Sequence, residues 1–364
     1  MFSTCDPSSE IPRFRPNILF SRTAVDGSRL PLESRSNGGT VATTSGLTTS
    51  AVERYFDELS NWGRWGRDDR KGTLNLITPE VRRQALASVR AGLAVSLSRD
   101  LDPSNPDPVH SGIAALERTT HAGEVKRSFG DGIRWDAAGE DIHVSPHGGN
   151  AHLDGLAHYS WDGKNYNGFP ADATTAEDGA TKLAVHHAAE GIITRGVLLD
   201  IAGLFGVEFV ERGYAITPSD LEAAEKRQGV TVGSGDALLI HTGNAAAIIA
   251  DGPLYLGESK GPLDGVQTGL DASALPYLRE RDIAIMGADG THDVQPPQFS
   301  DFNFARPIHS VSLVAIGLWL MDNLDLTGLT AECTKSEQWD FLFTALPWRF
   351  VGSTSSPLNP VAVL

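Results

Sequence analysis

The sequence predicts an α/β fold, and three observations lead to that prediction. Segments with helix-capping residues alternate along the chain with short β-type runs. With 364 residues, the chain can bury a large core. A hydrophobic content of 40% and a charged content of 21% are ordinary for globular proteins, so a disordered or fibrous chain is disfavoured.

The N-terminal residues differ in composition from the rest. Residues 34–50 read SRSNGGTVATTSGLTTS, which is rich in Ser, Thr and Gly and offers little to bury. After residue 55 we find no internal repeat and no clear linker. We therefore predict a flexible N-terminal arm over residues 1–50 and a single domain over residues 51–364.

Two helices are predicted from their capping residues. In TPEVRRQALASVRAG, Thr78 is the expected N-cap, Pro79 occupies the first helical position and Gly92 can close the helix. TPSDLEAAEKRQG repeats this arrangement between Thr217 and Gly229.

Five apolar runs are predicted to be strands because they are short, β-prone and bounded by turn residues. They are RGVLLDIA (195–202), DALLIHTG (236–243), IAIMGAD (283–289), SVSLVAIG (310–317) and FVGST (350–354). Alternation of such strands with helices indicates a largely buried sheet.

Charge and cysteine content exclude several classes of function. A formal net charge of -16 argues against binding to nucleic acid or to an anionic membrane, so we expect a small-molecule substrate. The two cysteines, Cys5 and Cys333, form no CxxC pair, which disfavours a disulfide framework or a cysteine-built zinc site. The start of the chain lacks an apolar signal region, and the apolar run 311–324 is too short to span a bilayer. We expect a cytoplasmic protein with no membrane partner.

The segment SPHGGNAHLDGLAHY (145–159) concentrates potential metal ligands. If it is extended, His152, Asp154 and His158 share one face, and a turn brings His147 toward them. Imidazole nitrogen with carboxylate oxygen is a ligand set for Zn²⁺ or Mn²⁺. A polar cluster held by hydrogen bonds is the alternative. A nucleophile elbow, a Walker motif, an HExxH motif and a dinucleotide-binding glycine fingerprint are all missing from the sequence.

The chain resembles the metal-dependent cyclase superfamily, which includes kynurenine formamidase and isatin hydrolase, and it is most similar to the longer members. In HLDGLAHYSWDG, His152, Asp154 and His158 match the last three polar positions of the family pattern H-x-G-T-H-x-D-x-P-x-H. NWGRWG, GTLNLITPE, GADGTHDVQP, PIHSVSLVAIG and GSTSSPLNPVAVL extend the resemblance over roughly residues 55–364. The first His of the pattern falls on Gly148, one position after His147, and its Pro is replaced by Leu156.

The resemblance implies a swivelling β/β/α domain, a homodimer or higher homo-oligomer, and hydrolysis of amides or cyclic carbonyl compounds. It implies one divalent ion, Mn²⁺ or Zn²⁺, bound by His147, His152 and Asp154, with His158 as the catalytic acid or base. A second metal is possible, because His309 and Asp322 fall where relatives have a His and a Glu; the aspartate is shorter.

On this basis we expect a metal-dependent hydrolase that opens an amide, lactam, imide or lactone by attack of a metal-activated water. The alternatives are a metal-dependent cyclase, dehydratase or isomerase without net hydrolysis, and a binding protein without catalysis.

Six further residues are candidates for the pocket. His292 and Asp293 follow a predicted strand, where a pocket position and a simple turn are equally compatible with the sequence. Aromatic side chains that either line the substrate or pack the core are Trp62, Trp65, Tyr159 and Trp161.

Overall fold

The computed structural model describes residues 46–102, 116–120, 127–129, 133–135, 139–147, 149–252, 266–299, 301 and 304–364. The chain divides into two units, Met1–Val41 and Ala42–Leu364, and the second contains everything described below. Most of the predicted arm, residues 1–45, lies outside the described residues. The division of the chain at residue 50 therefore stays a prediction.

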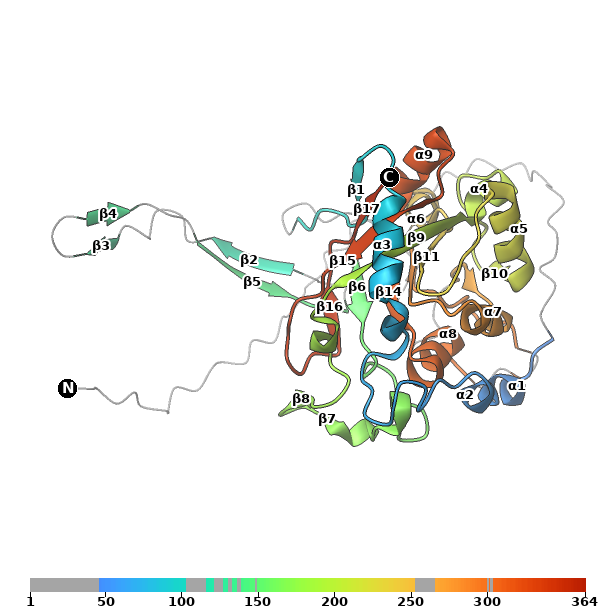
Figure 1. Cartoon of the computed structure of the whole chain (residues 1–364), viewed down its shortest axis with the longest axis horizontal. Helices are drawn as coiled ribbons and strands as arrows, with labels where there is room; N and C mark the ends of the chain where they lie inside the picture. Colours follow the sequence, from blue (N-terminus) through green and yellow to red (C-terminus); the bar gives the residue numbers. More distant parts are fainter. Residues whose placement is uncertain are drawn as a thin grey trace, which may run out of the picture. The chain divides into compact units, whose positions relative to one another are not determined.

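A mixed sheet organises the described part of the chain (Figure 1). Its nine strands run in the order β1 (Ala94–Ser96), β17 (Val361–Val363), β15 (Asp340–Ala345), β9 (Ile192–Asp200), β11 (Ala237–His241), β13 (Ile285–Ala288), β14 (Trp319–Asp322), β6 (His152–Asp154) and β16 (Ser355–Pro357). The four strands from β9 to β14 are parallel, and the strands on either side pair antiparallel. Every residue of β11, β13 and β14 is buried, as expected for parallel strands covered on both faces.

Short strands form four further pairs among the described residues. They are β2 (Leu116–Thr120) with β5 (Glu140–Val144), β3 (Arg127–Phe129) with β4 (Ile133–Trp135), β7 (Thr174–Thr175) with β8 (Gly179–Ala180), and β10 (Ala215–Ile216) with β12 (Gly269–Leu270).

Helices complete the α/β architecture that the sequence predicts. They are α1 (Thr49–Glu53), α2 (Tyr55–Glu58), α3 (Pro79–Ala87), α4 (Ile201–Phe205), α5 (Pro218–Gln228), α6 (Asn244–Asp251), α7 (Leu275–Glu280), α8 (Pro307–Ser310) and α9 (Thr327–Ser336). Short 3₁₀ turns are η1 (Gly72–Leu76), η4 (Tyr166–Gly168), η5 (Ala171–Ala173), η6 (Val185–Ala188) and η7 (Ala272–Ala274). Helix α3 packs on β9 and β15, and α5 also packs on β9.

The capping predictions are confirmed for one helix and half confirmed for the other. Helix α5 starts after Thr217 and ends at Gly229 in the left-handed region. The side chain of Thr78 accepts a bond from Val81 N, as an N-cap should, but α3 ends at Ala87 and not near Gly92. At its end, both the backbone N–H and the hydroxyl of Ser88 donate to the Ala85 carbonyl, so the last turn closes with i−3 bonds.

Two of the five strand predictions are wrong. Residues 310–317 are helical: α8 continues into a π-helix, η8 (Val311–Ile316), and the strand β14 begins only at Trp319. A fully buried apolar run has no periodicity that separates strand from helix. Pro307 at the first turn and Gly317 as the left-handed C-cap were the signals for a helix. Residues 350–354 form a turn that leads into β16.

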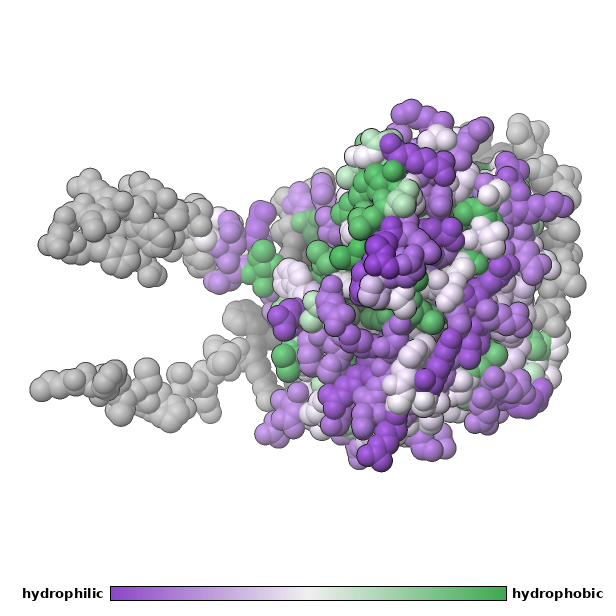
Figure 2. Space-filling view, viewed as in Figure 1, coloured by the Kyte–Doolittle hydropathy of each residue, from purple (hydrophilic) through white to green (hydrophobic). Residues whose placement is uncertain are grey.

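The described surface is largely polar on the face shown in Figure 2, with apolar side chains gathered near β17. Within the residues that the structure describes, no helix is both long and apolar enough to cross a membrane.

Candidate metal centre

Strand register brings three potential ligands from distant parts of the sequence onto one face. On β6, His152 and Asp154 are two residues apart, so their side chains point the same way. Strand β14 pairs antiparallel with β6 and places Asp322 directly opposite His152. All three side chains are buried, and one ligand atom from each lies within 4.8 Å of the others.

His158 reaches this group through a turn, which corrects the prediction that one extended face carries residues 152 to 158. Strand β6 ends at Asp154, and His158 N donates to the Gly155 carbonyl at 2.9 Å. A Cβ on Gly155 would lie 3.0 Å from Val185 Cγ1 and 3.1 Å from the Thr354 carbonyl, so the turn is made where only glycine fits well. The turn places His158 Nε2 3.6 Å from Asp154 Oδ2, while Leu156 joins the core.

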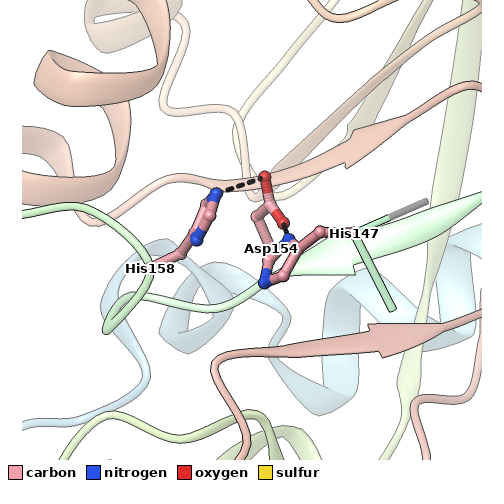
Figure 3. Close-up of side chains that lie close together, drawn as sticks. All are labelled: His147, Asp154 and His158. Carbon is pink, nitrogen blue, oxygen red and sulfur yellow. Dashed lines mark ion pairs between the residues drawn. The ribbon is translucent and has the colours of Figure 1, made fainter. Parts of the chain in front are cut away.

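His147 approaches Asp154 from the opposite side (Figure 3). Its Nδ1 lies 3.1 Å from Asp154 Oδ1, and its ring stacks on His158 with centroids 4.1 Å apart. Its Nε2 lies 3.3 Å from the Thr354 hydroxyl, so a residue just before β16 fixes the ring. His147, Asp154 and His158 therefore form a second group with ligand atoms within 4.8 Å of one another.

Helix α8 supplies a further imidazole, from His309. Its Nε2 is 3.3 Å from Asp322 Oδ2 and 3.8 Å from Asp154 Oδ2. Its Nδ1 lies 2.5 Å from Asp293 Oδ2, and the same carboxylate accepts a bond from Ile308 N at 2.7 Å. Asp293 thus holds both the start of α8 and the orientation of the ring.

His292 touches the other oxygen of Asp322. Its Nε2 is 3.3 Å from Asp322 Oδ1 and 3.1 Å from the Met321 carbonyl. The structure brings His292 and Asp293 against the candidate ligands Asp322 and His309, and their role in a pocket stays a prediction.

Electrostatics keeps both buried carboxylates ionised. Burial alone would raise the pKa of Asp154, but His147, His152 and His158 outweigh it and lower that pKa below its ordinary value. Burial would likewise raise the pKa of Asp322, but nearby histidines, His309 above all, lower it below its ordinary value. Burial lowers the pKa of His158 to about 4, so this imidazole is neutral near pH 7.

The donor set fits a divalent metal. Asp154 Oδ1 and Asp322 Oδ1 are buried without a hydrogen bond from any described group, a costly arrangement that a cation would relieve. His152 Nδ1 faces the Asn150 carbonyl at 2.8 Å and must donate to it, which leaves Nε2 as a free electron-pair donor. Asp154 belongs to both groups of ligand atoms, and Zn²⁺ and Mn²⁺ both accept nitrogen with oxygen.

The four aromatic candidates have different neighbours. The Tyr159 ring lies 4.8 Å from that of His158 and 5.3 Å from that of His309, between centroids. Trp161 stacks on Phe56 at 4.5 Å. Arg64 lies over the Trp65 ring at 4.7 Å.

Trp62 contributes in a way that the sequence analysis did not foresee. Its Nε1 donates to the Val314 carbonyl at 2.7 Å, and Asn61 donates to the Ile316 carbonyl at 2.9 Å. These bonds satisfy carbonyls of the π-helix that follows His309. A substrate-lining role for Trp62, Trp65, Tyr159 and Trp161 stays a prediction.

Asn150 and Thr354 were missed by the sequence analysis. Each orients one histidine of the site, the first through its backbone carbonyl and the second through its hydroxyl. Neither residue type signals such a role, although GSTSSPLNPVAVL, which contains Thr354, belonged to the quoted resemblance.

Comparisons with known proteins show what the chain is similar to. Residues 93–293 match the Cyclase family, described as "Putative cyclase". A crystal structure described as a novel cyclase is 28% identical, with a TM-score of 0.73, and the alignment covers 85% of this chain and 99% of that one. This similarity confirms the swivelling β/β/α fold. No curated protein matches the chain.

Two other solved structures are more distant. Isatin hydrolase A from Labrenzia aggregata is 20% identical over 76% of this chain and 94% of that one, with a TM-score of 0.47. A predicted metal-dependent hydrolase from Bacillus stearothermophilus is 14% identical over 74% of this chain and 97% of that one, with a TM-score of 0.42.

Proposed function

Because this chain belongs to the Cyclase family, we propose that it is a metal-dependent hydrolase of small molecules with an amide, lactam, imide or lactone carbonyl. One observation carries the proposal: Asp154 lies buried among four imidazoles. His147 and His152 approach its Oδ1 at 3.1 and 3.7 Å, and His158 and His309 approach its Oδ2 at 3.6 and 3.8 Å. A purely structural aspartate needs backbone or arginine donors, not four potential metal ligands.

We propose that His147, His152 and Asp154 hold the first ion, with Asp322 and His309 available for a second. In the structure the ligand atoms of Asp154 gather with those of His147 and His158 in one group and with those of His152 and Asp322 in the other. When bound, a divalent metal makes a water molecule nucleophilic near neutral pH and stabilises negative charge on a carbonyl oxygen. Mn²⁺ and Zn²⁺ are the two candidates.

His158 is proposed as the proton carrier. Its side chain retains 27% of its exposure, whereas those of His152 and His309 retain 5% and 4%, so it is accessible to a substrate from solvent. Asp154 Oδ2 lies 3.6 Å from Nε2 of His158, and the His147 ring that stacks on the His158 ring restricts its orientation. An imidazole so placed can take a proton from the attacking water and give it to the leaving nitrogen or oxygen.

Two substitutions test the scheme. Asp154→Ala should lose the metal and the activity together, because it removes the carboxylate shared by both groups of ligand atoms. His158→Ala should keep most of the metal and slow turnover by about 10² to 10⁴-fold. His143→Ala, on the exposed strand β5, is the matched control and should change neither metal content nor turnover.

Metal content is measured by elemental analysis, and turnover by mass-shift screening of amides, lactams, imides and lactones. A product heavier by one water supports hydrolysis. A product of unchanged mass, or one lighter by water, favours the alternative reaction, a cyclase, dehydratase or isomerase. Full activity of an extensively chelated, metal-free protein would contradict the proposal.

We further propose a cytoplasmic homodimer or higher homo-oligomer with a small-molecule substrate and no nucleic-acid or membrane partner. The net charge of -16 supports the last two statements. Light scattering on the purified protein tests the oligomer, and a monomeric mass would contradict it.

A further inference from the structure

His292 occupies a backbone position that ordinary residues avoid. It lies between β13 and α8 with a φ of +56°, in the left-handed region where a side chain adds strain. Its carbonyl accepts a bond from Leu270 N at 2.6 Å, which anchors this conformation to strand β12. The side chain is fully buried as a result.

The ring contacts establish which nitrogen carries the proton. Nε2 donates to the Met321 carbonyl at 3.1 Å, and Asp322 Oδ1 lies 3.3 Å from the same nitrogen without receiving a hydrogen bond from it. Both atoms are acceptors, so Nε2 must be the donor and cannot at the same time offer an electron pair to a metal. Nδ1 is then the acceptor, and none of the described protein groups donates to it.

A small cavity borders the ring. Its volume is about 10 Å³, and Thr242, Asp289 and Gly290 line it together with His292. This space matches a single water molecule, and the polar lining offers the partners that a buried water needs.

We propose that His292 is a positioning residue for Asp322: its Nε2–H donates to the carbonyl of the neighbouring Met321 and so fixes β14 with the ring against Oδ1, Oδ2 then faces His309 and the metal centre, and one buried water donates to its Nδ1. The inference rests on the proposed function, because the carboxylate it orients is a candidate metal ligand. The two oxygens of Asp322 have different neighbours: Oδ1 lies 3.3 Å from His292 Nε2, and Oδ2 lies 3.3 Å from His309 Nε2. A ligand oriented in this way binds metal more tightly than one free to rotate.

Two substitutions at this position separate the donor from the packing. His292→Leu removes the Nε2–H, whereas His292→Gln keeps an N–H donor at a similar reach; neither residue favours a positive φ, so both carry similar backbone strain. His241→Gln is the matched control, because His241 is also buried and bonds an aspartate, Asp200, at 2.8 Å outside the metal centre.

The readout is the affinity of the metal-free protein for Mn²⁺ and Zn²⁺, measured by titration calorimetry. His292→Leu should weaken binding by about 10 to 100-fold, while His292→Gln should stay within about threefold of wild type. His241→Gln should lower thermal stability without changing the metal affinity. A crystal structure of the wild-type protein should show one water within hydrogen-bond distance of His292 Nδ1.

The outcomes distinguish this inference from the proposed function. A wild-type protein that binds neither ion overturns the proposed function and this inference with it. A wild-type protein that binds metal while His292→Leu binds equally well overturns this inference alone. The same holds if His292→Gln is as weak as His292→Leu, or if the crystal structure shows Nε2 bound to the metal.

Discussion

Asp293 offers the sharpest test of how the second half of the site is held. Its carboxylate is buried and accepts bonds from Ile308 N at 2.7 Å and from His309 Nδ1 at 2.5 Å. Asp293→Asn retains the oxygen that faces Ile308 and replaces the other oxygen by an amide nitrogen. The proton of His309 must then move to Nε2, the atom that faces Asp322 and Asp154.

The expected magnitudes differ for the two obvious variants. Asp293→Asn loses one charge-assisted hydrogen bond, which costs about 1.5–3 kcal/mol of unfolding free energy. Asp293→Ala leaves two buried N–H groups without an acceptor and should cost about 3–5 kcal/mol. The Asn variant should therefore fold, yet bind metal about 10 to 100-fold more weakly, because a protonated Nε2 offers no electron pair.

The assay pairs thermal unfolding with calorimetric titration of Mn²⁺ and Zn²⁺. Asp271→Asn is the control, since Asp271 is equally buried and accepts a backbone bond from Ser273 N at 2.9 Å, and its described hydrogen bonds include none with a histidine. It should lose stability and keep its metal affinity. If Asp293→Asn binds metal as tightly as wild type, then Asp293 does not control the proton position on His309 and the reasoning fails.

Two further predictions concern stability. Burial would lower the pKa of His241, but the Asp200 carboxylate at 2.8 Å raises it above its ordinary 6.5. The ion pair therefore contributes its full stabilisation of the folded state below about pH 6.5. This contribution is lost as the pH rises through the raised pKa. The melting-temperature difference between wild type and His241→Gln should shrink from about pH 6 to about pH 9, and a constant difference would contradict the ion pair. Gly72→Ala should lower the melting temperature more than Gly66→Ala, because both have positive φ but only at Gly72 would a Cβ overlap the Gly317 carbonyl. Equal losses in the two variants would show that the overlap does not matter.

The fold could be predicted where local chemistry and tertiary context agree. Thr217 and Gly229 delimit α5 because capping is a local property. Residues 310–317 were misassigned because burial on all sides removes the periodicity on which a strand or helix assignment depends.

The site could be predicted in part for a similar reason. Four candidate residues lie close together in the sequence: His147, His152, Asp154 and His158. Local geometry alone therefore brings them into contact, although a turn and not a strand positions His158. The pairing of Asp322 with His152 depends on the register of two strands far apart in the chain, and spacing alone cannot reveal it. Asp322 was identified instead from the resemblance to the cyclase superfamily.

The position of β6 in the sheet also bears on how the protein matures during synthesis. This strand lies between β14 and β16, and all three of its residues pair with β16, which is translated long after them. Thr354, immediately before β16, also steadies His147. A nascent chain in which β16 has not yet been made would leave one edge of β6 unpaired, so we expect the proposed metal site to form only after residues 355–357 have been translated. Truncation before residue 354 should disrupt the proposed metal site, although it removes none of the candidate ligands.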